Sequence, residues 1–251
     1  MIEMVEIQER ALGLRRRGRR ADDQVSFKAA IAALLSDLPI NAMVEGRSGV
    51  HLSRSHRHLG TASRYRSPTS AKTLPYLLDQ LASEDLSLIE QDLGYRGQDG
   101  HRNRTVVRAS AKFVEMLRHR GLSSADFGEV IRSETVELKD TPVRAGRPGV
   151  RMEYRDTDQT SRFRQEMAEI NSHLATAEID FRGPYPVDIH RRQLYRVFTR
   201  RSFKSGGRLF GGFWQEMRKS DRLQYLRIDG EDIVELDYGQ IMPRLVYAHE
   251  K

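Results

Sequence analysis

Apolar residues in the first half of the chain recur at helical spacing in three segments, which span about residues 26–38, 69–83 and 110–121. The first helix is expected to begin with Ser26 as its N-cap and to end at Pro39, which interrupts a helix. The positions expected to be buried are Phe27, Ile31, Leu34, Leu35 and Leu38 in the first helix, Ala71, Leu74, Leu78 and Leu81 in the second, and Phe113, Val114 and Leu117 in the third.

Short alternating runs predict strands between these helices. Residues 50–52 form one such run, and residues 86–90 and 104–108 form two more. The last two flank a polar stretch with glycines at 94–103, which is typical of a hairpin with a long turn. The first half therefore contains a helix, a strand, a basic turn, a strand and a helix in succession.

The second half alternates between strands and short helices, which predicts an α+β arrangement. The helix at 158–174 places Phe163, Met167, Ile170 and Leu174 on one face, with Asp158 or Thr160 as its cap. In the final strand we expect Val234 and Leu236 to face the core. The other predicted elements are strands at 134–138, 194–198 and 232–236, a helix at 221–226 and a hairpin turn at Asp229-Gly230.

Composition narrows the class of protein. The 251 residues include no cysteine, which excludes disulfides and thiolate chemistry, and no apolar run long enough to cross a membrane. We therefore expect a cytoplasmic protein. The net charge of +7 favours polyanionic partners, although solubility alone also explains a modest net charge. Five arginines crowd into residues 15–20, and such blocks often contact nucleic acid.

These patterns divide the chain into four parts. We expect a mobile basic arm at residues 1–22 and a folded DNA-binding domain at 23–121. A linker with strands and one helix is expected at 122–186, followed by an α+β segment at 187–251.

Residues 25–120 resemble the winged-helix family, most clearly from Thr69 to Leu117. The resemblance implies that the helix before the wing enters the major groove of DNA and that the wing contacts the backbone. Ser70, Lys72 and Thr73 would then face bases. The wing residues expected to face phosphates are Arg96, His101, Arg102 and Arg104, and further residues expected to bind DNA are Arg16, Arg17, Arg64 and Arg66. The family also includes protein-interaction modules, so this alternative stays open.

The segment from Asp237 to Arg244 places a carboxylate directly after a predicted strand. It reads Asp-Tyr-Gly-Gln-Ile-Met-Pro-Arg and resembles the first metal-binding motif of family A DNA polymerases, which reads Asp-Tyr-Ser-Gln-Ile-Glu-Leu-Arg. Gly239, Met242 and Pro243 depart from that motif, and the proline is similar to the corresponding motif of family B polymerases. The segment is therefore most similar to a divergent polymerase-like palm, as in replication proteins of phages and mobile elements.

The palm resemblance implies that Asp237 binds Mg²⁺ and that nucleoside triphosphates are substrates. Because Met242 replaces the acidic residue that helps family A reject ribonucleotides, the choice of sugar is open. Uncharacterised bacterial proteins that join a winged helix to such a segment are also similar, with Gly206-Gly207-Arg208 and Arg222 ahead of the strand. The side chains expected to take part in catalysis are Lys204, Arg208, Arg222, Asp237 and Arg244.

Several alternatives stay open for this half. Phe210, Phe213 and Trp214 could stack on bases or form core. Asp237 could instead cap a following helix. No second carboxylate of a palm follows before Lys251, so we expect an incomplete palm that does not polymerise alone. The competing hypothesis is a DNA-binding regulator or replication initiator without catalysis, whose C-terminal sheet is structural.

Overall fold

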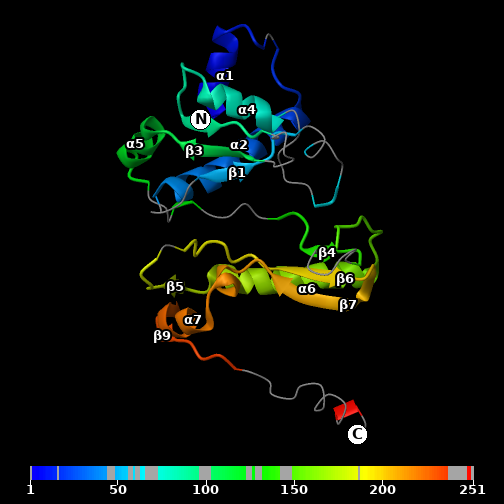
Figure 1. The fold of residues 1–251 in the computed structure, drawn as a ribbon. Coiled ribbons are helices and arrows are strands. Elements are labelled where there is room, and N and C mark those ends of the chain that lie inside the picture. The colour runs from blue at the N-terminus through cyan, green and yellow to red at the C-terminus, as the bar shows by residue number, and fades with distance from the viewer. Residues whose placement is uncertain are drawn as a thin grey trace.

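The described part of the chain folds into two lobes of mixed α and β structure, which lie one above the other in Figure 1. Most residues up to 122 form the N-terminal lobe, and residues 132–236 form the C-terminal lobe. Within the described ranges, no helix is both long and apolar enough to span a bilayer. The computed structural model describes residues 2–15, 17–43, 49–55, 59, 63–65, 73–95, 103–122, 126–127, 132–141, 149–185, 187–236 and 248–249.

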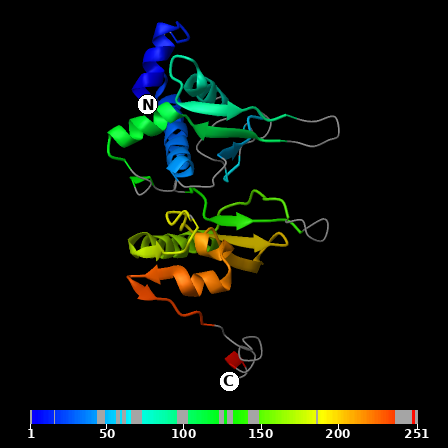
Figure 2. The same cartoon turned by 60° about the vertical axis from the view of Figure 1, so that its left-hand side comes forward.

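The N-terminal lobe holds a three-stranded antiparallel sheet of order β1-β3-β2. Figure 2 shows β2 and β3 side by side as the two arms of a hairpin. One core forms from the sheet and the helices packed on it, and it includes Phe27, Leu78 and Phe113. The elements are α1 (Ile2–Ala11), α2 (Ala21–Met43), β1 (Val50–Leu52), α4 (Thr73–Ala82), β2 (Ile89–Asp92), β3 (Thr105–Ala109) and α5 (Ala111–His119).

The helix α2 is longer than its apolar pattern predicts. It begins at Ala21, so Ser26 lies inside the helix instead of capping it, and it continues past Pro39. Asp22 and Asp23 occupy the first turn, where the helix dipole favours negative charge. Pro39 is buried, and packing of its ring offsets the single backbone hydrogen bond that proline cannot donate. The predicted boundaries of this helix are therefore wrong.

The hairpin and the helix behind it follow the sequence closely. The strands β2 and β3 flank the polar stretch at 94–103, and Ser110 caps α5 by accepting a hydrogen bond from the Phe113 backbone N–H at 3.1 Å. Gly121 follows the helix with a φ of 66°, a conformation that glycine adopts without steric cost. The hairpin and the helix that follows it are confirmed, although β2 spans Ile89–Asp92 and not the predicted residues 86–90.

The helix α1 packs against the rest of the N-terminal lobe, whereas the sequence predicts a mobile arm at residues 1–22. Val5 of α1 is fully buried in the main core, and Gln8 and Glu9 are buried beside it. A single apolar anchor in a polar helix gives little signal in a sequence. The interactions that hold α1 come instead from residues far along the chain.

The C-terminal lobe holds two small sheets, of order β4-β6-β7 and β5-β8-β9. In the first, β4 runs parallel to β6, while β7 pairs with β6 as an antiparallel hairpin. Phe163 of α6 stacks on Phe198 of β6 with ring centroids 4.8 Å apart, so α6 covers one face of this sheet. The elements are β4 (Val136–Leu138), α6 (Asp158–Thr176), β5 (Ile179–Phe181), β6 (Tyr195–Thr199), β7 (Ser202–Phe210), a 3-10 helix η2 (Phe213–Glu216), α7 (Lys219–Tyr225), β8 (Leu226–Ile228) and β9 (Glu231–Asp232).

Residues 132–181 belong to the C-terminal lobe and do not form a separate linker. The strand β4 pairs with β6, and Val136 packs with Phe163 and Phe198 in one core. Thr157 caps α6 and exchanges hydrogen bonds with Thr160, so the cap lies one position before Asp158 and three before Thr160, the two caps expected. The α+β class predicted from the sequence is confirmed.

The final strand is shorter than predicted. Asp229 and Gly230 form the expected hairpin turn with φ values of 52° and 80°. Beyond Asp232 the chain leaves the sheet, because its partner β8 is only three residues long. Val234 and Leu236 are 79% and 78% exposed. The prediction of a strand at 232–236 with these two side chains in the core is therefore wrong.

Candidate nucleic-acid interface

The β2–β3 hairpin presents polar and aromatic side chains to solvent near its turn. Arg104 is exposed, and Tyr95 is 64% exposed on the other arm. The Asn103 backbone N–H donates to the Tyr95 carbonyl oxygen at 3.0 Å, which closes the hairpin at this point. Arg108 forms an ion pair with Asp92 across the two strands at 2.6 Å. The arms of the hairpin are thus ordered up to the residues expected to contact phosphates.

The helix α4, expected to read bases, offers little open surface. Its first described residue, Thr73, is half-buried, and Ser70 and Lys72 lie outside the described residues. Asp79, the exposed residue of the helix, is bound by Arg54 at 2.7 Å. That ion pair lowers the pKa of the Asp79 carboxyl. Between residues 73 and 82 the helix has no lysine or arginine, so its outer face does not attract phosphate.

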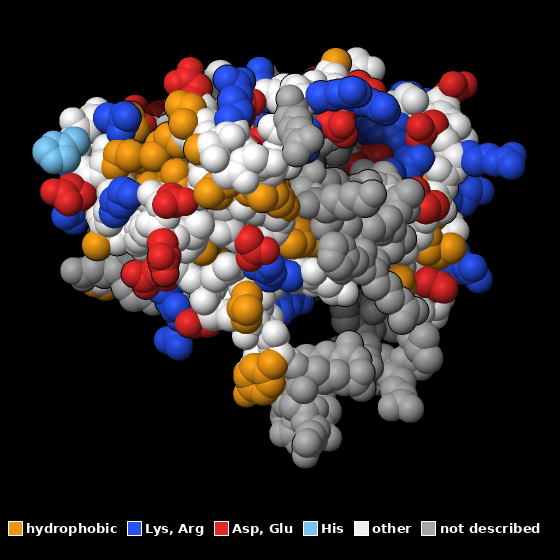
Figure 3. Space-filling model, turned by 90° about the horizontal axis from the view of Figure 1, so that it is seen from above, with side chains coloured by type: hydrophobic (Ala, Val, Ile, Leu, Met, Phe, Trp, Pro, Cys, Tyr) orange, Lys and Arg blue, Asp and Glu red, His pale blue; other side chains and the backbone are white. Residues whose placement is uncertain are grey.

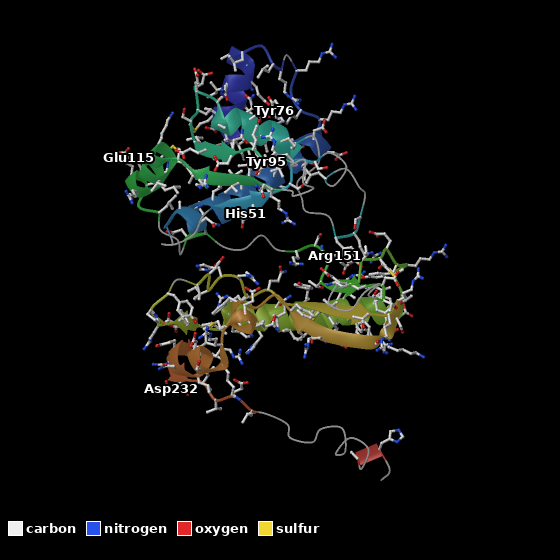
Figure 4. The ribbon with its side chains drawn as sticks, in the orientation of Figure 1. His51, Tyr76, Tyr95, Glu115, Arg151 and Asp232 are labelled. Carbon is white, nitrogen blue, oxygen red and sulfur yellow. The ribbon has the colours of Figure 1, made fainter. Side chains whose placement is uncertain are left out.

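The helix α1 covers part of that outer face. The Gln8 side chain donates to the Ser83 hydroxyl at 2.7 Å, and the Tyr76 hydroxyl donates to the Glu9 carboxylate at 2.7 Å. Figure 4 labels Tyr76 in the upper part of the N-terminal lobe, near α1. Burial, with the bond to Glu9, raises the pKa of Tyr76 to about 12. DNA can approach this face of α4 only if α1 moves aside.

The arginine-rich segment after α1 folds back onto the acidic side of the helix. Arg19 pairs with Glu9, and both side chains are almost fully buried. The Arg19 guanidinium also lies 3.4 Å above the centre of the Phe27 ring. Arg17 is exposed, and with Arg15 it lines a cavity of about 300 Å³ beside this pair. Part of the basic arm is therefore neutralised within the protein.

Arg64 is bound inside the protein and is not presented to a phosphate. Its guanidinium forms ion pairs with Glu134 at 3.2 Å, Glu153 at 3.5 Å and Asp156 at 2.9 Å. Burial tends to lower the pKa of Arg64, but its hydrogen bonds to Asp156 and Tyr154 outweigh that effect and raise it. Because three carboxylates surround it, a DNA contact by Arg64 is not favoured by this geometry.

The surface seen from above the N-terminal lobe is electrostatically mixed. Figure 3 shows lysine and arginine side chains interspersed with aspartate and glutamate on this face. The net positive charge of the chain is therefore not concentrated on this face as one basic patch.

In the C-terminal lobe, β7 presents two of the expected phosphate-binding residues to solvent. Its exposed positions are Lys204, Gly206, Arg208 and Phe210, and they alternate with half-buried ones. We see no ion pair of Lys204 or Arg208 in the part of the chain that is described. Gly206 and Gly207 have φ values of 90° and 87°, which accompany the shift in pairing register near Phe198.

Arg222 has a structural role. It donates to the Met217 carbonyl oxygen at 2.8 Å and pairs with Glu235 at 3.2 Å. The Glu235 carboxylate is therefore held by a guanidinium. Phe213 is buried and Trp214 packs against the same core, so of the three aromatic candidates only Phe210 is exposed. Base stacking by Phe213 and Trp214 is not favoured by this packing.

A cavity of about 570 Å³ opens beside η2 and α7. Four of its polar side chains form two pairs: Arg191 binds Glu216, and the Tyr185 hydroxyl donates to Asp221 at 2.7 Å. These bonds lower the pKa of both the Glu216 and the Asp221 carboxyls. Asp188 and Arg218 also line the cavity, so its polar lining carries both signs of charge and does not favour one class of ligand.

The structure also brings together a cation cluster that the sequence did not reveal. Glu137 of β4 is only 1% exposed. Its carboxylate lies 2.7 Å from a guanidinium nitrogen of Arg151, 3.5 Å from one of Arg132 and 3.7 Å from Nζ of Lys139. In the sequence, the available sign of this cluster is the charged Glu137 between the apolar residues of a predicted strand. Its cationic partners lie before and after that strand in the chain and come close to it only in the folded protein.

The predicted metal site lies outside the described residues, as do all of residues 237–247. This applies to Asp237 and Arg244, and also to Arg16, Arg66, Arg96, His101 and Arg102. Among the residues that are described, no three histidine or carboxylate side chains are close enough to hold a metal ion together.

No family matches this chain. Comparison with protein-family models, with curated proteins and with solved structures finds no match in any of the three.

Proposed function

We propose that this chain is a nucleic-acid-binding protein whose N-terminal lobe is a winged helix. The observation that carries the proposal is the order of elements together with their pairing. A helix, a strand, a helix and a hairpin follow one another as α2, β1, α4, β2 and β3, and the sheet order is β1-β3-β2. In the winged-helix arrangement the hairpin is the wing, and here it ends in a segment with three arginines.

The charge distribution indicates which part of the lobe contacts nucleic acid. The described residues of α4 carry no cation and are partly covered by α1, whereas the hairpin segment 96–104 contains Arg96, Arg102 and Arg104. Contacts from the hairpin to phosphates do not require α1 to move. The proposal is therefore backbone binding through the wing, with base contacts by α4 dependent on displacement of α1.

The test is binding of a labelled duplex by fluorescence anisotropy at several salt concentrations. Replacing Arg96, Arg102 and Arg104 with glutamine should weaken binding and reduce the salt slope by up to about 2.7, since each lost phosphate contact on B-DNA contributes about 0.9. A control carries Arg155→Gln and Arg162→Gln, which change exposed arginines of the other lobe. Unchanged duplex binding by the wing variant would overturn the winged-helix proposal.

A second proposal, nucleotidyl transfer, rests on the polymerase-like motif at residues 237–244. Asp237 would bind Mg²⁺, and the exposed Lys204 and Arg208 of β7 would bind phosphates of a nucleoside triphosphate or template. Nucleotide incorporation by the purified chain, or by a longer protein that contains it, should be lost with Asp237→Ala. Incorporation that survives this substitution would mean that the palm proposal is wrong, whereas a parent protein that incorporates no nucleotide would leave the non-catalytic regulator or initiator as the explanation.

A further inference from the structure

The sheet β4-β6-β7 has one face covered by α6 and a second face with a distinct composition. Directly opposite residues of paired strands share a face. Val197 lies opposite both Glu137 of β4 and Arg208 of β7, and Tyr195 lies opposite Phe210. These five residues therefore share the face away from α6, which we call the Glu137 face.

The Glu137 face carries an excess of positive charge. Arg132, Lys139 and Arg151 all approach the carboxylate of Glu137, so three positive charges meet one negative charge and two remain unbalanced. The buried carboxylate fixes where the cations stand. Its Oε2 accepts no hydrogen bond in the described part of the chain, which leaves the Lys139 amine at 3.7 Å free to donate elsewhere.

A neighbouring cluster shows that such an excess is not general in this lobe. Arg64 and Arg164 share Glu134, Glu153 and Asp156, so there two positive charges meet three negative ones. That network has no need of an external anion. Among the described residues, the Glu137 face carries more cations than carboxylates, and a bound anion would balance that excess.

Aromatic rings lie next to these cations. The Arg132 guanidinium stands 4.1 Å from the centre of the Tyr195 ring, and the Phe210 ring lies 6.1 Å from that of Tyr195. Phe210 is 39% exposed. Aromatic rings beside cations are a usual means of binding single strands, because bases stack on the rings while cations hold the phosphates.

We propose that the Glu137 face binds single-stranded nucleic acid. Arg132 contacts Tyr195 at one end of β6, and the Lys139 backbone N–H bonds to Phe198 near the other end. Both cations also approach the carboxylate of Glu137, at 3.5 and 3.7 Å, so they can hold one phosphate together while bases of the same strand stack on the neighbouring Phe210 ring. The site is separate from the wing, and its residues all lie between 132 and 210.

The test uses the full chain and a labelled oligothymidylate of about eight nucleotides, a length within the usual site size. Arg132→Gln with Arg151→Gln should weaken binding at least tenfold and reduce the salt slope by about 1.4, since each lost contact on a single strand contributes about 0.7. The control with Arg155→Gln and Arg162→Gln removes the same charge from exposed sites of the same lobe and should bind normally. Circular dichroism verifies folding.

A second variant, Phe210→Leu, keeps every charge and should also weaken single-strand binding. Three results would overturn the proposal: unchanged binding by the arginine variant, an equal loss in the control, or binding of inorganic tripolyphosphate without binding of the oligonucleotide. Duplex binding through the wing is measured separately, so failure of the proposed function and failure of this site are distinguishable.

Discussion

At the scale of single residues, buried carboxylates decide where the basic side chains of this protein stand. Glu9, Glu134 and Glu137 are each buried and each approached by two or more cations. Arg19 and Arg64 lie in basic stretches of the sequence, but in the fold they form ion pairs with carboxylates. Counting cations therefore overstates the charge available to a polyanion.

Removal of the Glu9 side chain should strongly lower the free energy of unfolding. Glu9→Ala leaves the buried Arg19 with only the more distant Glu6 carboxylate at 3.6 Å, and loss of one partner of a buried pair typically destabilises by about 3 kcal/mol. We expect that decrease in the free energy of unfolding, measured by urea denaturation. Glu3→Ala alters an exposed carboxylate of the same helix and should change stability by less than about 0.5 kcal/mol. Equal effects would contradict the buried pair.

Two half-buried tyrosines predict a loss of stability at alkaline pH. Burial raises the pKa of Tyr65 and Tyr76 to about 12 in the folded protein, from an ordinary value of 10.0. Between these values the unfolded chain has released protons that the folded chain retains, so stability is full below pH 10 and falls as pH rises towards 12. The urea midpoint should fall less steeply in the Tyr65→Phe, Tyr76→Phe variant, and identical slopes would refute this assignment.

At the scale of elements, local signals predicted the strongly patterned segments and missed those fixed by distant contacts. The cap Ser110 and the turn at Asp229 involve neighbouring residues, so the sequence was sufficient there. By contrast, Val5 anchors α1 in a core built from residues far along the chain, and β4 lies beside β6 across some sixty positions. The Glu137 face depends on that pairing and for this reason could not be predicted.

The docking of α1 on α4 can be tested with a matched pair of substitutions. Val5→Asp places a charge at a fully buried position and should release the helix, while Ile7→Asp alters a residue that is 65% exposed on the same helix. We expect faster hydrogen exchange in α1 and several-fold tighter duplex binding for Val5→Asp alone. Faster exchange with unchanged duplex affinity would show that α4 does not contact DNA.

At the scale of the whole molecule, residues 63–65 connect the two lobes. Arg64 forms ion pairs with three carboxylates of the C-terminal lobe, and the Tyr65 hydroxyl accepts a hydrogen bond from the Leu138 backbone N–H at 3.1 Å. This segment lies between α2 and α4 in sequence, so the N-terminal lobe reaches into the other lobe by a loop. The relative placement of the two proposed nucleic-acid sites would depend on this segment.

Removal of this connection should separate the lobes. Arg64→Gln leaves Glu134, Glu153 and Asp156 with one cation fewer, and we expect a larger radius of gyration in solution scattering. Arg155→Gln changes an exposed neighbour and should leave the radius unchanged. A radius identical to that of the parent protein would mean that other contacts hold the lobes together.

The central claim is that two separate surfaces bind nucleic acid, a wing for duplex and a sheet for single strands. The most direct measurement is fluorescence anisotropy of both ligands with two variants of the full chain. Glutamine at Arg96, Arg102 and Arg104 should weaken duplex binding alone, and glutamine at Arg132 and Arg151 should weaken single-strand binding alone. The account is contradicted if either variant loses binding of both ligands. It is also contradicted if both variants still bind both ligands normally.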